Sequence, residues 1–111
     1  MKYLANILLS VLLFSQDTGT ISGKITDMKS GDEMPGVNVI IKGTYYGASS
    51  DIQGKYRIKN ISPGSYDIEI SMIGYKVILK TGVEVEKDEV VTLDFSIEET
   101  VLSFGEDVVV M

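Results

Sequence analysis

The side chains of this chain that could take part in chemistry are mostly carboxylates and lysines. Its 111 residues include 16 acidic and 10 basic residues but no His, no Cys and no Trp. Imidazole bases, thiolate nucleophiles, disulfides and the commonest zinc ligands are therefore missing together. We expect no catalytic residue, no metal site and no cofactor.

Asp51 is the carboxylate whose surroundings most resemble a site, in the run Asp51-Ile52-Gln53-Gly54. A calcium ion would need a cage of several carboxylates, and this loop offers one. The alternative is a tight turn, in which Asp51 hydrogen-bonds to nearby backbone and Gly54 supplies a positive φ. The residue types favour the turn.

An acidic pair followed by valines lies near the C-terminus, namely Glu106, Asp107, Val108, Val109 and Val110. Such an extended segment can add as a strand to the exposed sheet edge of a partner, where main-chain hydrogen bonds supply the affinity. The alternative is that the valines begin the next domain or add a strand to this one. A bare apolar end is an aggregation liability, so we expect the sequence to be a fragment of a longer protein.

Length and charge limit the classes of protein to which the chain can belong. With 111 residues there is room for one domain whose core is marginal in size. The formal net charge is -6, and the acidic residues are spread along the chain. A phosphate backbone would be repelled, so we exclude nucleic acid as a partner.

The elements that position these residues are predicted to be β-strands. Turn signals recur about every ten residues and separate runs in which apolar and polar residues alternate. The predicted turns contain Gly36, Asp51 with Gly54, Pro63 with Gly64 as the centre of a type II turn, and Gly74. About seven strands result, with these inward rows: Ile21 to Ile25, Val37 to Ile41, a weaker strand over 45–50, Tyr56 with Ile58, Tyr66 to Met72, Val77 and Leu79 with Val83 and Val85, and Val91 to Ile97.

The tyrosines and phenylalanines have two interpretations. They could form a platform on which sugar rings stack, or they could fill the core of the fold. Most of them occupy inward positions in the predicted strands, for example Tyr56, Tyr66 and Phe95. Core packing is therefore the favoured interpretation.

The first 15 residues are predicted to be a secretory signal peptide. Lys2 precedes an apolar stretch from Tyr3 to Phe14, which is too short to span a bilayer comfortably. A buried helix is the alternative, but the polar run from Gln16 to Gly19 follows at once, and we place the cleavage after Ser15. No Cys follows, which excludes an anchor built on a lipidated cysteine. The chain is expected to be exported.

Several motifs together resemble one known family. They are Gly23-Lys24-Ile25-Thr26-Asp27, Met34-Pro35-Gly36-Val37-Asn38-Val39, Ser50-Asp51-Ile52-Gln53-Gly54-Lys55-Tyr56, Pro63-Gly64-Ser65-Tyr66 and Ile73-Gly74-Tyr75. In this order they resemble the carboxypeptidase regulatory-like domain, over about residues 19–98. The resemblance implies an all-β, seven-stranded transthyretin-like (Ig-like) β-sandwich after the signal peptide. The same module is attached to peptidases, adhesins and outer-membrane receptors, so fold alone does not decide function.

The last stretch, residues 99–111, resembles the linker that follows this domain in TonB-dependent outer-membrane receptors. The resemblance implies that Glu106 to Val110 is a TonB box, which contacts the periplasmic domain of TonB. It also implies a plug and barrel that this sequence does not include, and a place on the periplasmic face of the outer membrane. Two alternatives stay open: a free-standing exported module that binds glycan or protein, and an accessory domain of a secreted peptidase.

Overall fold

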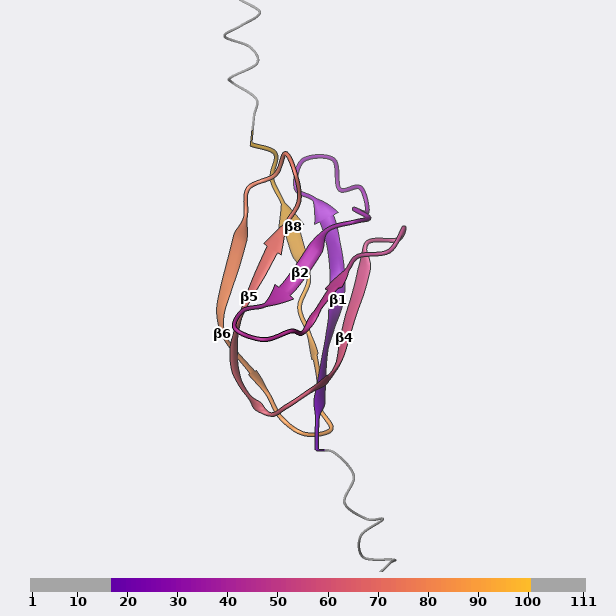
Figure 1. Cartoon of the computed structure of the whole chain (residues 1–111). Coiled ribbons are helices and arrows are strands. Elements are labelled where there is room, and N and C mark those ends of the chain that lie inside the picture. Colours follow the sequence, from indigo (N-terminus) through magenta and orange to yellow (C-terminus); the bar gives the residue numbers. More distant parts are fainter. Residues whose placement is uncertain (1–16, 101–111) are drawn as a thin grey trace, which may run out of the picture.

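The computed structural model describes residues 17–100 and shows an all-β fold, as predicted. Two sheets pack face to face, and within these residues there is no helix (Figure 1). The strands are β1 (Gly19–Asp27), β2 (Asn38–Ile41), β3 (Gly47–Ser49), β4 (Lys55–Ile61), β5 (Gly64–Ser71), β6 (Ile78–Val85), β7 (Val90–Thr92) and β8 (Phe95–Ile97). Within the described part of the chain, no helix is long and apolar enough to cross a membrane.

The two sheets have four strands each. One has the order β4-β1-β7, with β8 also paired to β1, and the other has the order β3-β2-β5-β6. The pairs are antiparallel, except that β7 and β8 run parallel to β1, with Thr20 opposite Val90 and Ile25 opposite Phe95. The first strand of the domain is therefore the central strand of its sheet.

The core lies between the sheets and is built from alternate residues of the strands, as a period of two requires. Most of the predicted inward residues are buried there, and the tyrosine at position 56 joins them. The buried apolar set is Ile21, Ile25, Val37, Val39, Ile41, Tyr56, Ile58, Ile61, Ile68, Ile70, Val83, Val85 and Ile97. Removing one such isoleucine from water contributes about 1.5–3 kcal/mol.

The predicted last strand is two strands, which makes eight rather than seven. Between β7 and β8 the chain bends so that the carbonyl of Leu93 lies against the α-carbon of Gly23. The amide of Leu93 donates to Ser22 O at 2.8 Å, and the Asp94 carboxylate accepts the Lys24 amide at 2.8 Å. A side chain thus replaces the backbone acceptor at this point, and the parallel ladder is interrupted.

The prediction that Val77 and Leu79 point inward is wrong, because both are exposed. The pairing of β5 with β6 shifts by one residue between Tyr66 and Ile68, and Gly82 has a φ of 67° at the shift. One extra residue in β6 reverses which side chains face the core. Val83 and Val85 beyond the bulge point inward as expected.

The turn at Pro63 and Gly64 is also different from the prediction. A type II turn needs a positive φ at its third position, but Gly64 has no such φ and begins β5 opposite Val85. The left-handed residue in this region is Asn60, with a φ of 60°, where the pairing of β4 with β1 shifts. Asparagine tolerates this conformation better than most residues. The left-handed residue of the reversal between β4 and β5 therefore lies within β4.

The end of the described chain is fastened to the segment that precedes β6. The Thr100 amide donates to Gly74 O at 2.9 Å, and Tyr75 forms an antiparallel bridge with Glu99. The Tyr75 hydroxyl donates to Asp27 Oδ2 at 2.8 Å, and Asp27 Oδ1 accepts the amides of Lys29 and Ser30. Asp27 therefore ties the first loop to the exit of the domain.

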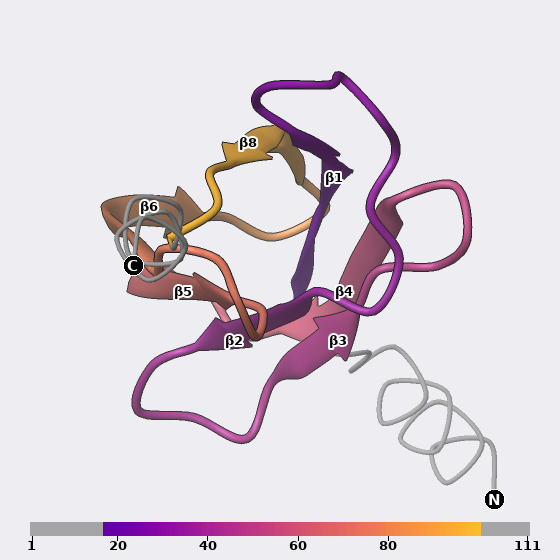
Figure 2. The same ribbon diagram turned by 90° about the horizontal axis from the view of Figure 1, so that it is seen from above.

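The two ends of the described chain lie at opposite ends of the sandwich (Figure 1). The predicted signal peptide, residues 1–15, and the segment Glu106 to Val110 lie outside the described residues. Viewed down the strands, the β3 and β4 edges of the two sheets adjoin on one side of the molecule (Figure 2).

Candidate functional site

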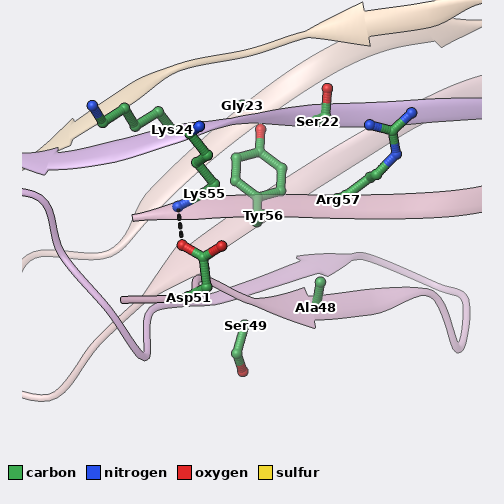
Figure 3. A pocket seen from close by; sticks show the side chains of 9 residues that line it. All are labelled: Ser22, Gly23, Lys24, Ala48, Ser49, Asp51, Lys55, Tyr56 and Arg57. Carbon is green, nitrogen blue, oxygen red and sulfur yellow. Dashed lines mark hydrogen bonds between the residues drawn. The ribbon is translucent and has the colours of Figure 1, made fainter. Parts of the chain in front are cut away.

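A groove between the two sheets is lined by charged side chains. Its volume is about 580 Å³. Within residues 17–100, no group of three or more His, Cys, Asp or Glu side chains could hold a metal ion. The groove is lined from β1, β3, β4 and the turn before β4 by Ser22, Gly23, Lys24, Ala48, Ser49, Asp51, Lys55, Tyr56 and Arg57 (Figure 3).

Asp51 lies in the turn that joins β3 to β4, and its carboxylate is hydrogen-bonded to the backbone of that turn. Its Oδ1 accepts the Lys55 amide at 2.9 Å (Figure 3). It also accepts the Gln53 amide at 2.8 Å, and the Asp51 amide donates to Lys55 O at 2.8 Å. The Lys55 amide, followed by that of Gln53, holds the pKa of the carboxyl below its usual range. This is the capping role that the sequence predicted.

Gly54 completes the same turn with a φ of 78°. A Cβ at this position would lie 2.5 Å from the carbonyl oxygen of Ile25. The turn therefore needs glycine both for its backbone conformation and for its close approach to β1.

Tyr56 forms the inner wall of the groove. Its hydroxyl donates to Leu93 O at 2.6 Å. Burial, and then the charge of Asp94, raises the pKa of this phenol. A neutral, hydrogen-bonded phenol cannot act as a base here, so its role is to support β7 and β8.

The free charges of β4 are cationic, and those of Lys55 and Arg57 line the groove. Lys55, Arg57 and Lys59 are alternate, exposed residues of β4, and Lys24 of β1 lies directly opposite Lys55. Lys24 is paired with Glu33 at 2.7 Å, whereas no ion pair in the described part of the chain involves the three residues of β4. An excess of positive charge thus lies on one strand of a chain whose net charge is -6.

The side chains of this groove are better suited to binding than to acid–base chemistry. Its only carboxylate is committed to a turn, its phenol is neutral, and it contains no thiol or imidazole. Lysine and arginine side chains beside the hydroxyl of Ser22 are suited to anionic groups (Figure 3). We therefore regard the groove as a candidate binding surface for an anionic partner.

The residues singled out from the sequence do not form one site. Asp51 lines the groove, and the amide of Gly36 is bonded nearby to Ser50 O, but Gly74 lies at the exit of the chain and Gly64 pairs with Val85. Sequence reasoning missed the cations of β4. The alternation of Lys55, Arg57 and Lys59 with the apolar Tyr56 and Ile58 was the available signal.

Comparison with known families gives the identity of the domain. Residues 21–110 match the model of the CarboxypepD_reg-like domain. The chain belongs to this family. The match runs beyond β8 and includes Glu106 to Val110.

Two proteins from Formosa agariphila are similar in sequence to this CarboxypepD_reg-like chain. TonB-dependent receptor P39 is 37% identical over 98 residues, which cover 83% of this chain and 9% of the receptor. TonB-dependent receptor P3 is 29% identical over 86 residues, which cover 77% of this chain and 8% of the receptor. The chain thus spans less than a tenth of the length of these relatives.

A solved structure supports the fold of the family member. A chain in a type II cohesin–X-dockerin complex from Acetivibrio cellulolyticus superposes with a TM-score of 0.60 and 28% identity. The similarity covers 69% of this chain and 52% of that chain.

Proposed function

We propose that this chain is a non-catalytic N-terminal accessory domain of a TonB-dependent outer-membrane receptor. The observation that carries the proposal is the similarity to receptors P39 and P3, which covers most of this chain but only a small part of each receptor. The rest of such a receptor, its plug and barrel, would follow the domain. The domain would be exported and would lie on the periplasmic face of the outer membrane.

In this role Glu106 to Val110 would be the segment presented to TonB. The family match extends through these residues, which supports their being a regular part of the domain's sequence. The Thr100 amide is bonded to Gly74 O, and this end of the described chain lies at the opposite end of the sandwich from the start of β1 (Figure 1). The segment would pair with a sheet edge of TonB through its backbone.

The test is a titration of the purified chain with the periplasmic domain of TonB, followed by NMR shifts of Val108 to Val110. Val109→Pro removes a backbone donor and should abolish binding, whereas Val109→Thr keeps strand propensity and should bind nearly as well. Absence of shifts in the parent, or equal binding by both variants, would reject strand pairing with TonB.

The coding sequence downstream of Met111 provides a second test. Plug and barrel strands there support a receptor. A genuine stop codon would favour the free-standing binding module, and a zinc-ligand pattern would favour the accessory domain of a peptidase.

A further inference from the structure

The three free cations of β4 form a regular row. Lys55, Arg57 and Lys59 occupy alternate positions of one strand, so the α-carbons of neighbouring members are about 6.7 Å apart along it, and Lys59 lies just before the register shift at Asn60. Any extended peptide has the same repeat. Acidic side chains at alternate positions of such a peptide would therefore match this row one for one.

The β4 strand also has an unpaired backbone edge, because it is an edge strand of its sheet. The Ile25 amide donates to Gly54 O, and Gly23 and Ile21 lie opposite Tyr56 and Ile58. In an antiparallel ladder alternate residues face the partner, so the backbone groups of Lys55 and Arg57 face outward. Those of Lys55 are bonded to Asp51, which leaves the N–H and C=O of Arg57 open at the groove.

The opposite wall of the groove comes from the other sheet. It is formed by Ala48 and Ser49 of β3, whose side chains are small. The pairing of β3 with β2 has the same alternation: Tyr46 O accepts the Ile41 amide, and Val39 lies opposite Ala48. The backbone of Ser49 therefore also faces away from its sheet.

Lysines on an edge strand commonly protect a protein against unwanted strand pairing. Here the row has that effect on a second copy of the chain, since two β4 strands side by side would bring six cations together. The same row would favour a strand of opposite charge, because cross-strand pairs of opposite charge are stabilising. A lipid phosphate could neutralise the cations and accept a bond from the Arg57 amide, whereas an added strand both accepts from that N–H and donates to the C=O of Arg57.

We propose that the β4 edge binds an extended acidic segment of a partner protein as an added strand. Its backbone pairs with Arg57, and its alternate carboxylates face Lys55, Arg57 and Lys59. The surface is made by residues of β4 and includes none of Glu106 to Val110. The partner is therefore additional to TonB.

The probe is an eight-residue peptide of alternating glutamate and valine, added to the isotope-labelled full chain. We expect NMR shifts at Arg57 and Ser49. Two further peptides carry N-methyl groups on alternate amides: one peptide on the glutamate amides, the other on the valine amides. Only one of these two sets of amides faces β4 in an added strand. One methylated peptide should therefore lose affinity by about tenfold or more, and the other should stay within about twofold of the unmethylated peptide. Equal affinities of the two methylated peptides would refute strand addition.

The matched charge variants are Arg57→Glu and Lys80→Glu. Both reverse an exposed cation of an edge strand, but Lys80 lies on β6 in the other sheet. Arg57→Glu should weaken peptide binding about tenfold or more, and Lys80→Glu should change it by less than about twofold. Equal effects would reduce the interaction to general electrostatics and overturn the proposal.

Other occupants of the edge would give different results. Binding to phosphatidylglycerol vesicles but not to the peptide would assign the cations to a lipid surface. Shifts at Arg57 on dilution of the chain alone would assign the edge to a second copy. Either result overturns the proposal without bearing on the titration with TonB.

Discussion

Replacing Gly23 by alanine tests how closely β1 is packed against the connection between β7 and β8. A Cβ at Gly23 would lie 1.8 Å from Leu93 O and 2.6 Å from Leu93 C. Real Cβ atoms keep at least 3.0 Å from such atoms, so the carbonyl must retreat by about 1.2 Å. Gly23 has no positive φ, and the cost is therefore steric.

That movement would break two hydrogen bonds. They are the bond from the Leu93 amide to Ser22 O at 2.8 Å and the bond from the Tyr56 hydroxyl to Leu93 O at 2.6 Å. Each contributes about 1 kcal/mol, and lost packing around Leu93 adds to this. We expect Gly23→Ala to lower the free energy of unfolding by about 2–4 kcal/mol, which corresponds to a Tm lower by about 10–25 °C.

Equilibrium unfolding in urea, followed by circular dichroism, measures the effect. Gly64→Ala is the matched control, because its Cβ would meet the Tyr66 ring at 3.4 Å and no positive φ is involved. It should stay within about 0.5 kcal/mol of the parent or be slightly more stable. If Gly23→Ala and Gly64→Ala unfold at the same urea concentration, the proposed contact between Gly23 and Leu93 is wrong.

The remaining predictions concern pH, the Asp51 turn and export. The Ser30 amide, the Tyr75 hydroxyl and the Lys29 amide hold the pKa of Asp27 below 3.8, and the bond to Asp27 raises the pKa of Tyr75 to about 12. The chain should therefore lose stability as pH falls below 3.8 and as it rises from 10 towards 12. Tyr75→Phe should weaken both pH dependences, whereas replacing the exposed Tyr45 by Phe should weaken neither. Identical pH profiles of unfolding for the two variants would contradict this. Gly54→Val should cost about 1 kcal/mol or more, with Lys55→Ala nearly neutral, and equal melting temperatures would show that the turn is misassigned. Mass spectrometry of the chain expressed in a Gram-negative host should show an N-terminus near Gln16, whereas a full-length cytoplasmic product would rule out the signal peptide.

The sequence predicted the parts of the fold that depend on local alternation. Val37 to Ile41 and Ile68 with Ile70 follow a strict period of two and are buried as expected. Val77 and Leu79 follow the same period, but the bulge at Gly82 reverses their phase. Gly82 inside the strand is a local signal of a bulge, but the change of phase that it causes is set by the pairing with β5.

The candidate groove was less predictable for a related reason. The alternation of cationic and apolar residues in β4 is visible in the sequence. These cations form a candidate binding site only because β4 is an edge strand beside the small residues of β3. Strand order is a property of the whole chain. The turn at Asp51 was predictable because its hydrogen bonds are made within five residues.

The central position of β1 has a consequence for how the domain forms. This strand needs β4 on one side and β7 and β8 on the other, and residues 90–97 are about 70 positions away from it in the chain. Contacts between such distant segments close large loops, so their formation is slow compared with that of helices or hairpins. During synthesis or export, β1 keeps one side unpaired until nearly all of the domain has emerged. A chain interrupted before Val90 would expose that side of β1, with the apolar core behind it, to other unfolded chains.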